Sequence, residues 1–331
     1  MPAPPPIGSG PGRDFDVDCR YVSRGEDGAA DNELRITAGR RNLAFIDISD
    51  RDGKLRLRGT DRCKGRAKPR LDNIDSIALN FDKSPFAFVS ISTSEASLGP
   101  GATREDDGSS EIEVTSGHLR FPLGMQLGGT DDTVTAGPIS EETVGTNLTA
   151  GVDSDIDLRT PVRAGLELQL GDGDDAFTSD SSQVRGGDII VLGDVSVFGD
   201  SGDDTLTGGP GFDFLGGGSG SDIIAGRGSF DFIQGGEDDD ELEGNGSGDF
   251  IEAQGGNDDV SGGRGEDYIE ANDARSDRVD CGDDRDYAAV DRRRDNYQNC
   301  ERLKTGVGRA AEARMSARQA ETADRARRLF R

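Results

Sequence analysis

The hydrophobic pattern of the chain changes character between its two halves. Between residues 14 and 170, apolar and polar residues alternate over short stretches, which predicts half-buried β-strands. The predicted strands are 43–48, 54–58, 74–81, 86–92, 111–114 and 166–170. We expect an all-β amino-terminal region that leads into and caps the structure that follows, because repeat proteins generally need terminal caps. A separate sandwich domain is the alternative.

Residues 199–270 instead repeat every nine residues, in eight copies with neither insertion nor deletion. The copies read GDSGDDTLT, GGPGFDFLG, GGSGSDIIA, GRGSFDFIQ, GGEDDDELE, GNGSGDFIE, AQGGNDDVS and GGRGEDYIE. The first place is Gly except for Ala253. The eighth place is always aliphatic: Leu206, Leu215, Ile224, Ile233, Leu242, Ile251, Val260 and Ile269. The sixth place is always aspartate: Asp204, Asp213, Asp222, Asp231, Asp240, Asp249, Asp258 and Asp267.

Each place of the repeat has a physical reason. Glycines in the first half permit a turn with positive φ and allow neighbouring backbones to approach closely. The last three residues form a short strand, in which the eighth-place side chain points inward and its two neighbours point outward. One apolar residue per strand makes a core too thin to balance the conformational entropy lost on folding. The missing stability must come from a bound partner.

Charge indicates the kind of partner. The chain has a formal net charge of -27, and residues 199–270 hold 19 Asp and Glu against 2 Arg. Nucleic acids and anionic membrane surfaces are excluded as partners, because both need clustered Lys and Arg. No apolar run approaches the roughly 20 residues that insertion across a membrane needs. Carboxylates and turn carbonyls favour calcium, and Mg²⁺ is the weaker candidate because it demands octahedral geometry and keeps its waters.

These nonapeptides resemble the repeats-in-toxin, or haemolysin-type, calcium-binding family, whose pattern is GGxGxDxUx with U a large aliphatic residue. The resemblance implies an all-β fold, a right-handed parallel β-roll or β-solenoid with two nonapeptides per turn. It also implies that each calcium ion lies between one turn and the next, with roughly six ions in all. One edge of the roll would carry Asp204, Asp222, Asp240 and Asp258, and the other Asp213, Asp231, Asp249 and Asp267.

The pattern also has departures and isolated copies. The fourth-place Gly is replaced by Ser229, Asp238 and Ser247, and we expect the turns around these residues and Ala253 to depart most from the family's sites. Two isolated copies precede the repeats, GGTDDTV at 128–134 and LGDGDDAF at 170–177. The second adds Asp175 as a further metal ligand.

Aromatic residues occupy the outward-facing seventh place in alternate repeats. They are Phe214, Phe232, Phe250 and Tyr268, which we call the aromatic ladder. With two repeats per turn they stack on one sheet at about 4.8 Å spacing. An exposed apolar ladder of this size is usually covered or used, so we predict a contact surface for the carboxyl-terminal helix, an amino-terminal segment or a partner. Cross-strand stacking that stiffens the sheet is the alternative.

Four cysteines form two local pairs, one near each end of the chain. Cys19 with Cys63 and Cys281 with Cys300 predict two disulfides and an oxidising compartment, with four free thiols as the alternative. We expect a disordered start at 1–13, the all-β region at 14–170, the calcium-binding roll at 171–270 and a helical tail at 304–331. Residues 271–303 resemble the degenerate closing coil of actinobacterial members of the family.

The chain has too few histidines for the common hydrolytic sites. GDSGD at 199–203 resembles the nucleophile loop of trypsin-like proteases, but it lies in phase with the repeats, and His118 is the one histidine of the chain. A serine triad needs a partner histidine, and a HExxH zinc helix needs two. We interpret His118 as a strand or loop residue and predict no catalytic residue.

Together these features predict a secreted, non-catalytic, extracellular or cell-surface protein whose roll folds on binding calcium. An adhesin or carbohydrate-binding module that uses the aromatic ladder is the alternative, with a cell-surface polysaccharide or protein as its partner. A polysaccharide-modifying enzyme with an unrecognised active site in residues 1–170 is a further alternative.

Overall fold

A computed structural model of the protein describes residues 17–22, 32–38, 43–51, 54–58, 63–65, 76–80, 86–92, 113–117, 123–127, 132–138, 143–147, 158–161, 166–179, 195–291 and 293–305. The expected disordered start at 1–13 and His118 lie outside these residues. So does most of the expected helical tail, although its first two residues, 304 and 305, belong to a strand. Within the described residues, no helix has the length and apolarity needed to cross a membrane.

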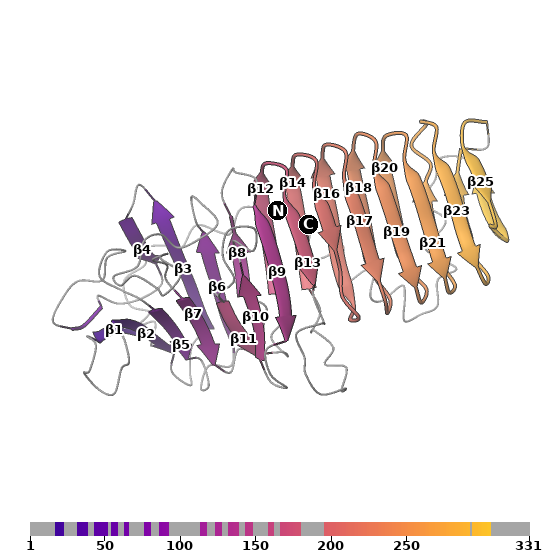
Figure 1. Cartoon of the computed structure of the whole chain (residues 1–331). Coiled ribbons are helices and arrows are strands. Elements are labelled where there is room, and N and C mark those ends of the chain that lie inside the picture. The colour runs from indigo at the N-terminus through magenta and orange to yellow at the C-terminus, as the bar shows by residue number, and fades with distance from the viewer. Residues whose placement is uncertain are drawn as a thin grey trace.

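In this part of the chain the structure consists of two long sheets (Figure 1). The 14-stranded sheet contains, in spatial order, β1 (Val17–Val22), β2 (Glu33–Ala38), β5 (Ser76–Asn80), β7 (Glu113–Gly117), β11 (Leu158–Pro161), β10 (Thr143–Asn147), β9 (Thr133–Pro138), β13 (Ala176–Ser179), β15 (Thr205–Thr207), β17 (Ile223–Arg227), β19 (Glu241–Gly246), β21 (Asp259–Arg264), β23 (Arg278–Asp283) and β25 (Asn296–Gln298).

The 12-stranded sheet contains β26 (Arg302–Thr305), β24 (Tyr287–Val290), β22 (Tyr268–Ala271), β20 (Phe250–Gly255), β18 (Phe232–Glu237), β16 (Asp213–Ser219), β14 (Val195–Ser201), β12 (Leu166–Asp172), β8 (Leu123–Gln126), β6 (Phe86–Ser92), β3 (Leu43–Arg51) and β4 (Lys54–Arg58).

Strands from β12 onward alternate between the two sheets along the chain, so each turn contributes one strand to each sheet. Neighbouring strands are parallel, and in the repeats a residue pairs with the one 18 positions on: Ile224 with Leu242 and Phe232 with Phe250. The strands therefore stack along one axis as a parallel β-solenoid (Figure 1). This confirms the predicted fold class and two repeats per turn.

The core is as thin as the repeat predicts. All eight eighth-place aliphatic side chains have 0% exposure and belong to one apolar cluster that runs along the inside of the solenoid. The cluster continues at the amino-terminal end through Leu34, Ile36, Ile77 and Leu79. Burial of one aliphatic side chain per strand fixes which face of each strand points inward, because a shift by one residue would turn every side chain to the other face.

The amino-terminal strands belong to the same two sheets as the repeats. Each predicted strand of this region contains or overlaps an observed one, from β3 at Leu43–Arg51 to β12 at Leu166–Asp172. Antiparallel pairs occur here, between β1 and β2, β3 and β4, β9 and β10, and β10 and β11. The sheets pass through residues 170 and 270 without a break, and the domain boundaries expected there stay predictions.

Both predicted disulfides are present. Cys19 is bonded to Cys63 and Cys281 to Cys300, with Cα–Cα distances of 4.4 and 5.2 Å. The first links β1 to the segment 63–65, which also pairs with β1 through Tyr21 N and Lys64 O. The second joins β23 to the chain just before β26, so it closes the last turn of the solenoid. Each bond thus stabilises one end of a structure whose middle has little core.

Candidate metal centre

The sixth-place aspartates form two columns, one along each edge of the solenoid. Asp204, Asp222, Asp240 and Asp258 each directly precede a strand of the 14-stranded sheet. The other column is associated with the 12-stranded sheet: Asp213, Asp231, Asp249 and Asp267. All eight side chains are at most 4% exposed. Buried carboxylates need hydrogen bonds, counter-charges or protons, because burial otherwise disfavours the charged form.

One oxygen of each carboxyl is held by the backbone of the preceding turn. Asp231 N donates to Asp249 Oδ1 at 2.8 Å, and Asp249 N donates to Asp267 Oδ1 at 2.7 Å. In the other column Asp222 N donates to Asp240 Oδ1 at 2.9 Å. These bonds fix each carboxyl against the preceding turn and set which way its second oxygen points.

The second oxygen is buried and accepts no hydrogen bond in most of these aspartates. Among the described residues this holds for Oδ2 of Asp204, Asp222, Asp231, Asp240, Asp249, Asp258, Asp267, Asp277 and Asp286. Leaving a buried acceptor unpaired costs about 1–3 kcal/mol, and more if it is charged. Repetition of this cost along both edges indicates that the oxygens have a ligand rather than a defect of packing.

The first-place glycine lies against the second carboxyl oxygen in the seven repeats that have one. A Cβ built on Gly244 would be 2.5 Å from both Asp249 Oδ2 and Gly262 O. A Cβ on Gly208 would be 2.6 Å from Asp213 Oδ2 and 2.7 Å from Gly226 O. The absence of a side chain therefore brings a carboxylate oxygen together with a main-chain carbonyl oxygen of the next turn. Such a set of oxygens, without nitrogen or sulfur, fits a hard cation.

Burial, followed by the charges of neighbouring aspartates, raises the pKa of these carboxyls. Two carboxyls of the second column are affected most, with the pKa of Asp231 raised to about 10 and that of Asp249 to about 9. Desolvation also raises the pKa to about 7 for Asp204, Asp240, Asp267 and Asp277, and to about 6 for Asp222, Asp258 and Asp286. Burial of these columns therefore favours a protonated or cation-bound carboxyl over a free carboxylate.

The columns are longer than the eight repeats. Asp175, expected from the isolated copy, is 2% exposed, and its Oδ1 accepts from Asp132 N at 2.7 Å. Sequence reasoning missed Asp132, Asp277 and Asp286, which occupy equivalent buried positions. Asp258 N donates to Asp277 Oδ1, and Asp267 N to Asp286 Oδ1, across 19 residues instead of 18. The available signal was an aspartate two places before an apolar residue. It was present for Asp132 in the isolated copy at 128–134, and for Asp277 and Asp286 a single inserted residue shifted it out of phase.

At the three fourth-place departures from the repeat the backbone takes a positive φ. Ser229, Asp238 and Ser247 have φ values of 80, 78 and 77°, so these fourth-place residues adopt the left-handed conformation that a glycine adopts without strain. Next to Ala253, Asp258 still has a buried Oδ2 that accepts no hydrogen bond.

Asp213 differs from the other sixth-place aspartates in the hydrogen bonding of its second carboxyl oxygen. Its Oδ2 accepts from Gly209 N at 2.6 Å, while its Oδ1 accepts from Val195 N at 3.4 Å. Asp213 opens its column, and the residue one turn before it is Val195 rather than another aspartate. The second oxygen is consequently held by its own turn.

Clusters of side chains alone would not reveal these sites. The described residues contain no group of three or more His, Cys, Asp and Glu side chains placed to hold a metal ion. Each turn instead offers one carboxylate together with main-chain carbonyls. Such a site depends on the backbone of two successive turns, so it forms only when the solenoid is stacked.

The aromatic ladder is stacked as predicted but is not exposed. Adjacent rings from Phe214 to Tyr268 are 4.7–4.9 Å apart with interplanar angles of at most 10°. The four rings are only 0–6% exposed. Stacking covers the faces of the rings, and their outer edges are buried as well.

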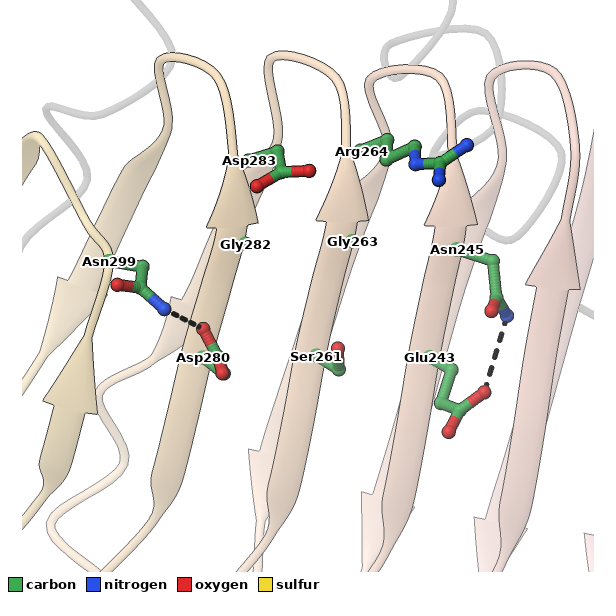
Figure 2. Close-up of a pocket in the computed structure, with 9 residues that line it drawn as sticks. All are labelled: Glu243, Asn245, Ser261, Gly263, Arg264, Asp280, Gly282, Asp283 and Asn299. Carbon is green, nitrogen blue, oxygen red and sulfur yellow. Dashed lines mark hydrogen bonds between the residues drawn. The ribbon is translucent and has the colours of Figure 1, made fainter.

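A polar hollow of about 460 Å³ lies on the 14-stranded sheet, near its carboxyl-terminal end (Figure 2). Its side chains already contact one another: Asn299 Nδ2 donates to Asp280 Oδ1 at 2.8 Å, and Asn245 Nδ2 to Glu243 Oε2 at 3.3 Å. Arg264 and Asp283 lie at its upper rim in the view of Figure 2. The described residues that line the hollow are polar, charged or glycine.

Comparison with known families matches the repeats and leaves the rest of the chain unmatched. The model of the RTX calcium-binding nonapeptide repeat (4 copies) matches residues 192–215, 216–251 and 234–269. No curated protein and no solved structure matches the chain. The matched residues include the whole period-nine segment except its last residue, Glu270. Both aspartate columns run through them.

Proposed function

Because residues 192–269 are RTX calcium-binding nonapeptide repeats, we propose that this chain is a secreted, non-catalytic protein whose roll folds when calcium binds between successive turns. The observation that carries the proposal is the row of buried Asp Oδ2 atoms that accept no hydrogen bond and lie beside carbonyl oxygens of the next turn. Calcium takes six to eight oxygens of these kinds.

The proposed ligands are the eight sixth-place aspartates together with Asp175. Asp277 and Asp286 extend the two columns, so we propose roughly six to eight ions along the roll. Each ion would neutralise carboxylates whose burial and mutual repulsion otherwise oppose folding. Without calcium, the acidic repeats would repel one another and the turns would separate.

Calcium-dependent folding also suits the proposed extracellular location. RTX repeats bind calcium, and the two disulfides fit an oxidising compartment. Sites in extracellular modules bind calcium with dissociation constants of about 10⁻⁴–10⁻³ M. With sites in this range the chain would be unfolded where calcium is scarce and folded outside the cell.

The test is a calcium titration of the full chain after chelation, followed by far-ultraviolet circular dichroism. We expect a cooperative gain of β-structure with calcium, reversal by chelator and no comparable gain with magnesium. Isothermal titration calorimetry on the same protein counts the ions. A spectrum that is rich in β-structure and indifferent to calcium would contradict the proposal.

A pair of substitutions tests the ligand assignment within one column. We expect Asp231→Asn to raise the calcium midpoint roughly tenfold, because it removes a charged oxygen that has no other partner. Asp213→Asn should raise it less than about threefold, since Asp213 Oδ2 is already held by Gly209 N. Both changes keep the shape of the side chain and an acceptor at Oδ1. Equal shifts in the titration would show that the unpaired oxygens are not the calcium ligands.

A further inference from the structure

A second row of polar side chains accompanies the first aspartate column. It occupies the fifth place of the repeat, directly before each column residue, and we call it the outer row. Its members are Asp174 in the isolated copy at 170–177, followed by Asp203, Ser221, Asp239 and Asn257. All five are exposed, whereas the column aspartates that directly follow them are buried. Each turn of this edge thus has a buried and a solvent-facing polar group next to one another in the chain.

Hydrogen bonds between turns fix the carboxyls of the outer row. Ser221 N donates to Asp203 Oδ1 at 2.8 Å, and Asn257 N donates to Asp239 Oδ1 at 2.7 Å. Asp203 N donates in the same way to Asp174 Oδ1 at 3.1 Å. Each carboxyl therefore holds the amide of the residue directly before the column aspartate of the following turn. Although exposed, these carboxyls have a defined place beside the column.

The outer row brings its negative charge to the column aspartate of the following turn. Burial, and after it the charge of Asp203, raises the pKa of Asp222. Burial, and after it the charges of Asp273 and Asp239, raises the pKa of Asp258. Oδ2 of Asp222 and Oδ2 of Asp258 are buried and accept no hydrogen bond. Each of these two positions thus combines a buried oxygen that needs a ligand with a second carboxylate close enough to act on that ligand.

Outer carboxylates belong to particular turns and not to the repeat in general. Ser221 stands in the row without a carboxylate, so the column residue of the following turn, Asp240, has no outer carboxylate at this place. Beside the second column, the fifth-place residues are Phe212, Phe230, Gly248 and Glu266. The rings of Phe212 and Phe230 stack there, with centroids 5.8 Å apart and an interplanar angle of 5°. The turn at Ser221 is therefore a natural comparison for those at Asp203 and Asp239.

We propose that the outer row supplies second carboxylates to calcium sites of the roll, one from Asp203 and one from Asp239. Asp203 strengthens the site at Asp222, and Asp239 strengthens the site at Asp258. Both act through their charge, while their hydrogen bonds to the following turn hold them in place. This inference rests on the proposed function, because it presupposes that calcium binds between successive turns.

The sign of the effect depends on whether the site holds an ion. An empty site with one ionised column aspartate carries a negative charge, which repels the outer carboxylate. The same site with a calcium ion carries a net positive charge, which attracts it. The outer row therefore opposes stacking of the turns without calcium and favours stacking with calcium. Both effects make the folding of this edge depend more strongly on the ion.

Calcium titrations of the full chain, followed by circular dichroism, test the proposal. We expect Asp203→Asn with Asp239→Asn to raise the calcium midpoint about threefold at low ionic strength, because the amides keep an acceptor oxygen and lose the charge. Salt screens exposed charges, so the difference from the wild type should fall below about 1.5-fold in about 1 M KCl. Ser221→Asp adds an outer carboxylate beside Asp240 and should lower the midpoint about twofold at low ionic strength.

Glu241→Gln with Glu243→Gln is the matched control, because it removes two exposed carboxylates from β19 of the same sheet and none from a turn. We expect this pair to change the midpoint by less than about 1.5-fold. A shift for the Asp203 and Asp239 variant no larger than that of the control, or one that persists in about 1 M KCl, would overturn the proposal. So would a higher midpoint for Ser221→Asp. A wild-type chain without any calcium-dependent transition would instead contradict the proposed function, which keeps the two failures apart.

Discussion

Without calcium, the roll should gain β-structure as the pH falls from about 8 to about 5, and with calcium it should need more of the ion at the lower pH. Both effects originate in the same buried carboxyls. Their folded-state pKa values of about 6 to about 10 lie above the value of about 3.9 in an unfolded chain. Protonation therefore accompanies folding in the absence of a cation.

The sign follows from the direction of these pKa shifts. A carboxyl with a raised folded-state pKa stabilises the fold fully below about pH 4, and this contribution is lost as the pH rises through the folded pKa. Asp204, Asp240 and Asp267 lose it near pH 7, and Asp222 and Asp258 near pH 6. Calcium needs the ionised carboxylate, so protons and calcium compete, and the calcium midpoint should fall as the pH rises.

Circular dichroism titrations at several pH values, with chelator and with calcium, measure both trends. Asp231→Asn with Asp249→Asn should weaken the acid-induced gain, because the amides are neutral at every pH. Glu241→Gln, which changes an exposed carboxyl of the other sheet, is the matched control. A calcium midpoint that does not change with pH would argue against carboxylate ligands.

The second large effect is expected from a single glycine. Gly236→Val should destabilise the calcium-loaded roll by about 2–4 kcal/mol, through backbone strain and steric overlap together. Gly236 occupies the second place of its repeat with φ of 143°, and a Cβ there would lie 2.0 Å from Gly218 O of the preceding turn. A β-branched residue tolerates such a φ poorly. The turn would have to move away from its neighbour, which separates the oxygens on both sides.

Gly228→Val is the matched control. Gly228 is also in a repeat turn, but a Cβ there would meet only Pro210 Cα, at 3.9 Å. We expect a change within about 0.5 kcal/mol, as for most surface substitutions. Urea unfolding at saturating calcium gives both values. Similar losses for the two variants would indicate that the turns need flexible glycine generally rather than close approach at one place.

The aspartate columns illustrate how far a periodic sequence can be followed. The resemblance to the nonapeptide family, with two repeats per turn, placed Asp222, Asp240 and Asp258 on one edge, and the uninterrupted period of nine kept that register through all eight copies. The repeat pattern did not identify Asp277 and Asp286 as members of the columns, although their side chains are buried in the same way. One inserted residue changes the spacing to 19, and only pairing of β21 with β23 and β22 with β24 restores the correspondence.

The amino-terminal half shows a different limit. Alternation of apolar and polar residues located strands such as β3, β5 and β6. It did not determine their partners, because alternation specifies the buried face of a strand and carries no information about its neighbour. Continuity of these strands with the two sheets of the repeats became visible only in the topology.

By itself, the sequence determined the local structure of the repeats, with turns at the glycines and inward aliphatic side chains. It predicted the two disulfide pairs from their spacing and, with two repeats per turn, the stacking of the aromatic rings. These features depend on spacing along the chain. Tertiary structure alone decided that the second oxygen of Asp213 is held by its own turn, and that Phe232 and Phe250 are buried while Ile223 is exposed. Such differences arise from contacts between segments far apart in the sequence, which a nine-residue pattern does not contain.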